Sequence, residues 1–87
     1  MLPASIGRLS ELRILDLRNN RVEALPAPIG DLHNLLYLDL RANTLTTLPE
    51  TLGDLPRLQK LDLRWTRIAG TPPCIARLEQ RGCVVLR

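Results

Sequence analysis

Aromatic side chains are nearly absent from this chain. It contains no phenylalanine, one tyrosine (Tyr37) and one tryptophan (Trp65), although 45% of its residues are hydrophobic. The core must therefore be aliphatic, and leucine is the residue that dominates it. A chain of 87 residues with 24% charged side chains has an ordinary composition for a soluble globular domain with a modest core. We expect one folded domain over residues 1–87.

Long apolar runs are also lacking. No stretch approaches the length of a membrane-spanning helix, and the first residues lack the basic and apolar regions of a secretory signal. We therefore expect a cytoplasmic protein with no membrane partner; a translocated bacterial effector is the alternative. The formal net charge of +3 comes almost entirely from arginine, since Lys60 is the only lysine. Such a mild excess favours acidic partners slightly.

The chain repeats itself every 23 residues, and the repeat decides the fold. The aligned columns are Pro3, Pro26, Pro49 and Pro72; Ile6, Ile29, Leu52 and Ile75; Leu9, Leu32, Leu55 and Leu78; and Leu15, Leu38, Leu61 and Val84. Gly7, Gly30 and Gly53 also align, with Ala76 in the last repeat. A period of this length is typical of solenoids, in which each turn of the chain packs only against its neighbours.

These columns resemble the leucine-rich-repeat family. Residues 12–20 and 35–43 both match its LxxLxLxxN signature, and the Leu-Pro-x-x-Ile/Leu-Gly-x-Leu that follows is similar to the 23-residue subclass of intracellular and bacterial proteins. The resemblance implies an α/β fold: a right-handed solenoid in a short horseshoe arc, with a parallel sheet on its concave face and short helical or 3₁₀ turns on its convex face. It also implies a role in binding other proteins.

The residues independently predict the same elements. Apolar and polar side chains alternate around Leu15, Leu38 and Leu61, as in strands with one buried face. We expect strands near residues 13–17, 36–40 and 59–63 and a weaker one near 83–86. The six leucines at 15, 17, 38, 40, 61 and 63 should be buried. The units are then a half repeat (2–11), three repeats (12–34, 35–57, 58–80) and a capping strand (81–87).

Residues for catalysis or metal binding are missing. The register puts Cys74 on the convex side and Cys83 on the concave face, too far apart for a disulfide. Two cysteines cannot complete a zinc site, and the single histidine, His33, lies in a distant convex turn. The glycines recur with the repeat, which indicates packing rather than a phosphate-binding loop. We expect no catalytic, cofactor-binding or metal-binding residues and therefore no enzyme.

Side chains on the exposed face of the sheet should form rows across the strands. The rows are Ile14, Tyr37, Lys60 and Cys83; Asp16, Asp39, Asp62 and Val85; and Arg18, Arg41, Arg64 and Arg87. Aspartates beside arginines could simply neutralise each other. Alternatively, Arg87 lacks an aspartate and, with Arg21 and Arg67, makes a basic border. The candidate partner-binding residues are Tyr37, Arg41, Lys60, Arg64 and Trp65.

Three functions compete at this point. The first is a protein-interaction module that binds a partner protein or peptide on the concave face, through a segment carrying an acidic residue beside an apolar one. The second is a structural or assembly unit, either a fragment of a larger repeat protein or a chain that self-associates weakly through its ends. That association could run head to tail or form a two-fold dimer covering Leu2, Ile6 and Leu9. The third, nucleic-acid binding, is disfavoured because the aspartate row would repel phosphates. Asn20 and Asn43 share a column in which Thr66 replaces the third asparagine. For Trp65 the alternative is therefore a structural role, as a lid over the gap that this replacement leaves.

Overall fold

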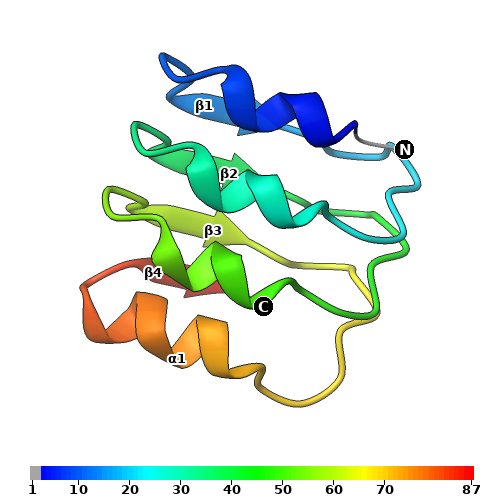
Figure 1. The fold of residues 1–87 in the computed structure, drawn as a ribbon. Helices are drawn as coiled ribbons and strands as arrows, with labels where there is room; N and C mark the ends of the chain where they lie inside the picture. The colour runs from blue at the N-terminus through cyan, green and yellow to red at the C-terminus, as the bar shows by residue number, and fades with distance from the viewer. Residues whose placement is uncertain (1–2) are drawn as a thin grey trace.

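The computed structural model describes residues 3–87, which form four coils stacked in chain order (Figure 1). Each coil adds one strand to a parallel sheet of order β1-β2-β3-β4. The strands are β1 (Ile14–Asp16), β2 (Tyr37–Asp39), β3 (Lys60–Asp62) and β4 (Val84–Leu86). Short 3₁₀ helices and one α-helix form the second layer: η1 (Ala4–Arg8), η2 (Ala27–Asp31), η3 (Glu50–Asp54) and α1 (Pro73–Gln80). The α/β solenoid expected from the repeat is confirmed.

The core lies between the two layers and is made of aliphatic side chains from both. Strand register places Leu15 beside Leu38 and Leu38 beside Leu61, so the leucines of successive coils stack directly. The helical layer adds its own inward column. The most completely buried side chains are Ile29, Leu32, Leu35, Leu38, Leu40, Leu45, Leu52, Leu55, Leu61, Cys74, Ile75 and Leu78. No coil could bury its leucines alone, and stacking buries them as one continuous column.

The glycine column exists because the helical segments approach closely. A Cβ atom at Gly30 would lie 2.6 Å from the backbone oxygen of Thr51, and one at Gly7 would lie 2.8 Å from that of Pro28. Neither distance leaves room for a side chain. The recurring glycines are therefore packing residues, as the sequence predicted.

Asn43 fills the turn that follows β2. Its side-chain oxygen accepts the backbone N–H groups of Asn20 (3.1 Å) and Val22 (2.9 Å) in the preceding coil. Its amide donates to the backbone oxygens of Leu17 (2.8 Å) and Leu40 (2.9 Å). Because Asn43 is buried, these bonds satisfy backbone groups that water cannot reach. In the next turn the corresponding residue is Thr66, whose hydroxyl donates one hydrogen bond, to the backbone oxygen of Leu63.

The predicted register of the last strand was wrong by one residue. Val85, not Val84, pairs with Leu61 and faces the core, while Val84 lies beside Lys60 on the opposite face. A shift of one residue exchanges the two faces of a strand. Cys83 is therefore buried rather than exposed on the concave face.

The cause of this shift is the length of α1. It has eight residues, whereas each 3₁₀ helix has five. The N–H of Arg81 bonds to the oxygen of Leu78, as that of Leu35 bonds to Leu32, but in the last coil the N–H of Cys83, five residues after Leu78, bonds to the same oxygen. Gly82, with a φ of 89°, makes the longer turn possible.

The burial expected for the first strand was also too high. Leu15 and Leu17 are only partly buried, although their counterparts in β2 and β3 are fully buried. The reason is that β1 is an edge strand, with one neighbouring strand among the described residues. Leu9 is exposed, and Leu2 lies outside the described residues.

Replacing Leu38 with alanine should lower the free energy of unfolding by about 2–5 kcal/mol, because the change leaves a cavity inside the stacked leucine column. Leu15→Ala should cost less, since part of Leu15 is already in solvent. Urea denaturation followed by circular dichroism measures both. A loss below about 0.5 kcal/mol for Leu38→Ala, the level of a surface change, would contradict the core.

Candidate functional site

The exposed face of the sheet, here called the concave face, carries a hollow of about 560 Å³. It lies over β1, β2 and β3 and the residues that follow them. Its lining is Ile14, Leu15, Asp16, Tyr37, Leu38, Asp39, Arg41, Lys60, Asp62 and Arg64. Four of the five predicted binding residues are therefore brought together here, and Trp65 lies outside the hollow.

Six charged residues of this face form a continuous set of ion pairs, here called the Asp–Arg ladder. They are Asp16, Arg18, Asp39, Arg41, Asp62 and Arg64. Within each coil the arginine Nη2 lies 2.7–2.9 Å from the carboxylate two residues earlier. Between coils, Arg18 Nε lies 3.6 Å from Asp39, and Arg41 Nε lies 3.3 Å from Asp62. Each carboxylate is therefore matched by at least one guanidinium.

The aspartates of the ladder also fix the backbone where each strand ends. In each of the three coils that carry the ladder, the backbone N–H of the arginine donates to the aspartate Oδ1 at 3.1 Å. The aspartate side chains become less exposed along the sheet, from 48% at Asp16 to 23% at Asp39 and 5% at Asp62. Asp62 is therefore a buried carboxylate that depends on Arg64 and Arg41 for compensation.

Hydrogen bonds from the arginines lower the pKa of Asp16, Asp39 and Asp62, against the opposing effect of burial. All three carboxylates are thus held ionised. Of the two interpretations of these rows, the structure supports a self-neutralising surface.

The expected basic border does not extend to Arg87. By register, Leu86 lies beside Asp62, so Arg87 falls one residue short of the arginine row and does not join it. Its guanidinium donates to the hydroxyl of Thr71 (2.9 Å) and to the backbone oxygen of Gly70. Arg87 therefore binds its own chain.

One row of the concave face takes no part in the ion pairs of the ladder and is here called the uncommitted row. Ile14, Tyr37, Lys60 and Val84 lie side by side on the four strands. Ile14 is 62% and Val84 56% exposed, and Tyr37 is exposed as well. The sequence already showed Ile14 as an outward strand residue, although it was not chosen for the site. Val84 was missed because the predicted register placed it in the core.

Trp65 lies in the turn that follows β3 and has an unusual backbone conformation. Its φ is 62°, in the left-handed region that its column shares with Asn19 and Ala42. The ring is 74% exposed, and the Arg64 Cζ lies 5.9 Å from its centroid, within cation–π range. A ring so exposed covers little of the sheet edge, so the structure does not support a lid over Thr66.

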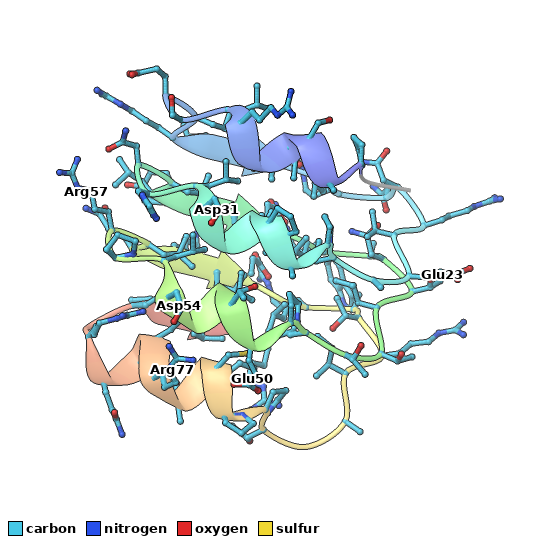
Figure 2. All side chains as sticks on the ribbon, viewed as in Figure 1. Glu23, Asp31, Glu50, Asp54, Arg57 and Arg77 are labelled. Atoms are coloured by element: carbon cyan, nitrogen blue, oxygen red, sulfur yellow. The ribbon has the colours of Figure 1, made fainter. Side chains whose placement is uncertain are left out.

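The helical side carries a second group of charges, which attaches α1 to the array. Figure 2 shows Arg77 of α1 beside Asp54 and Glu50 of η3. Arg77 also donates to the backbone oxygen of Glu50 (3.1 Å) and lies over Gly53, where a Cβ would come within 3.0 Å of it. These contacts hold the last coil in place, and nothing in them suggests a ligand.

No reactive cysteine or metal group stands out within residues 3–87. Cys74 and Cys83 are both free and buried, and burial is the main cause that raises the pKa of each thiol. No group of three or more His, Cys, Asp or Glu side chains in this range is placed to hold a metal ion. Within the same range, the helices are too short or too polar to cross a membrane.

Comparisons with known proteins identify the class. A family model described as leucine rich repeat matches residues 10–68. A solved leucine-rich-repeat protein of Leptospira interrogans is 38% identical over 98% of this chain, with a TM-score of 0.84. The chain spans 22% of the length of that protein. No curated protein matches significantly.

The chain therefore belongs to the leucine-rich-repeat family. Members of this family commonly bind other proteins and are typically not enzymes.

Stability should fall as the pH is lowered through the titration of the Asp–Arg ladder. The pKa of each ladder aspartate is below its unfolded value of 3.8, so the stabilisation is present above that value and is lost as the pH falls from about 5 toward the folded pKa. Urea denaturation at a series of pH values measures this. Asp39→Asn should reduce the dependence, whereas Glu23→Gln should not. An unchanged pH profile in Asp39→Asn would contradict a stabilising ladder.

Proposed function

We propose that this chain is a protein-interaction module that binds a partner protein or peptide on its concave face. The observation that carries this proposal is the uncommitted row of Ile14, Tyr37, Lys60 and Val84. Three exposed apolar or aromatic side chains flank a cation over a hollow large enough to receive side chains of a partner. A cluster of exposed apolar groups rimmed by charges is typical of an interaction surface.

The proposed binding residues are Tyr37, Arg41, Lys60, Arg64 and Trp65. Tyrosine, tryptophan and arginine are the residues that most often dominate binding energy. Arg41 and Arg64 use Nε and Nη2 in the ladder, and their Nη1 groups make no hydrogen bond among residues 3–87. Those groups stay available to a partner. Trp65, in the turn after β3, extends the proposed surface beyond the hollow.

The setting proposed for this interaction is the cytoplasm. Both thiols are free, which fits a reducing compartment. Delivery of a bacterial effector into such a compartment is the alternative, and it requires the same binding surface. We propose no nucleic-acid partner, since the ladder carboxylates line the hollow, and no membrane or cofactor.

Tyr37→Ala and Trp65→Ala should each weaken partner binding by more than about 2 kcal/mol, the level of a hot-spot residue. The partner is captured with the wild-type chain, purified, and titrated by calorimetry against each variant. Thermal stability should stay near wild type because both side chains are exposed, and Ala42 already occupies the left-handed position that Trp65 has.

His33→Ala is the matched control, since His33 is exposed in a turn on the helical side. It should leave binding unchanged. If all three variants bind equally well, the binding surface is not on the concave face. If Trp65→Ala lowers stability and leaves affinity intact, Trp65 has a structural role.

Assembly through the solenoid ends is a second candidate, favoured by the partly exposed leucines of β1. Head-to-tail growth is disfavoured at the other end, because Ala76 replaces the glycine that lets a following coil approach. A two-fold dimer through the β1 end is therefore the form we propose for this candidate.

The dimer makes its own prediction. Analytical ultracentrifugation at high micromolar concentration should show a dimer that Leu15→Arg abolishes, since an arginine there would place an unpaired charge in the contact. Monomer at every concentration would remove this second candidate.

A further inference from the structure

Lys60 differs from the other charged residues that line the concave hollow. The three carboxylates and three guanidiniums of the Asp–Arg ladder are paired with one another, and of these six residues Arg18 alone lies outside the lining. Lys60 lines the same hollow but takes part in none of the ion pairs found among residues 3–87. Its ammonium is therefore the one charge of the hollow without an ion pair among the described residues, and its partners on the adjacent strands, Tyr37 and Val84, are uncharged.

The neighbours of Lys60 are fixed by the strand register. Tyr37 lies beside it on β2 and Val84 on β4, each one strand spacing away, and Ile14 follows Tyr37 on β1. Strand spacing is about 4.8 Å, so the strand positions of Tyr37 and Val84 lie at roughly 5 Å on the two sides of Lys60, and that of Ile14 lies at roughly 10 Å on the side of Tyr37.

We infer that the hollow binds a short segment of a partner protein in which an aspartate or glutamate contacts Lys60 and aliphatic side chains flank it. This inference rests on the proposed function and specifies the partner. The anchoring cation is Lys60, because the guanidiniums of Arg41 and Arg64 already hold carboxylates of their own through at least two hydrogen bonds each. A carboxylate bound at Lys60 would give this ammonium the ion pair that it lacks among residues 3–87.

The spacing restricts the segment further. An extended chain advances about 3.3 Å per residue, so contacts at roughly 5 and 10 Å correspond to side chains about one to three residues from the acidic one. Valine, isoleucine or leucine at those positions would cover Tyr37, Val84 and Ile14. A polyanion fits poorly, since its repeated charges would face the three ladder carboxylates.

The probe is a random dodecapeptide library displayed on phage and selected on the immobilised wild-type chain. The selected peptides should share an acidic residue with an aliphatic residue within three positions. A synthetic peptide of the selected sequence is then titrated by fluorescence anisotropy. Lys60→Glu should weaken its binding at least about tenfold, and Lys60→Gln should weaken it less.

Arg8→Glu is the matched control. Arg8 is an exposed cation on η1, on the helical side, so the substitution changes net charge as Lys60→Glu does without touching the hollow. Its affinity should stay within about twofold of wild type. A new selection on Lys60→Glu should give peptides with lysine or arginine in place of the acidic residue. Circular dichroism verifies that each variant is folded.

The outcomes separate this inference from the proposed function. Selected peptides that lack an acidic residue, or whose binding is unaffected by Lys60→Glu, overturn the inference. If their binding is still lost in Ile14→Ser or Val84→Ser, the concave face remains the binding surface. Two results count against both the inference and the proposed function. One is a set of peptides whose binding is unaffected by the two substitutions of Lys60 and by Ile14→Ser and Val84→Ser. The other is a library that yields no binder.

Discussion

No coil of this protein can bury its own leucines, and most of the structure follows from that constraint. A strand of three residues with a short helical return offers one or two inward side chains and no second layer to cover them. Stacking supplies the cover, and it requires close approach of the helical segments, which the glycine column allows. It also requires the turns between coils to satisfy their buried backbone groups, which Asn43 achieves for two coils at once.

Stacking in register has a consequence for the exposed face. Parallel strands place identical positions side by side, so a repeated aspartate would meet aspartates and a repeated arginine would meet arginines. The ladder resolves this because Arg18 and Arg41 each lie between the carboxylate of their own coil and that of the next coil, and Arg64 pairs with Asp62 of its own coil. Exposed ion pairs contribute little individually. Asp62, nearly buried, depends most on its partners because an uncompensated carboxylate there would be costly.

Sequence pattern predicted the fold well because the fold repeats. Columns at 23 residues indicated the strands, the helical returns and the packing glycines. The errors lie where the period fails. In the last coil the return from Leu78 to β4 is longer, and the period alone could not show that Val85 rather than Val84 faces the core. Burial of Leu15 was overestimated because a repeat pattern says nothing about which coil lies at an edge.

The candidate site was only partly predictable for a different reason. Residue type singled out Tyr37, Lys60 and Trp65 as candidate binding residues, but it could not show which arginine donors are already occupied. That depends on how Arg41 and Arg64 orient toward the aspartates, which is a matter of geometry. The same limit hid Ile14 and Val84 as parts of one apolar row.

Positions that obey the repeat serve the fold first, so discrimination between partners depends most on positions that do not. Trp65 illustrates this. A bulky residue at a φ of 62° is strained by about 1–3 kcal/mol relative to glycine or asparagine, and its ring recovers little by burial because most of it is in solvent. Its stacking with Arg64 at 5.9 Å is an exposed cation–π contact, worth about 0.5–1 kcal/mol, which does not offset that strain. Trp65 is therefore a residue that the fold tolerates rather than needs, and its large apolar surface gains most when a partner removes it from water.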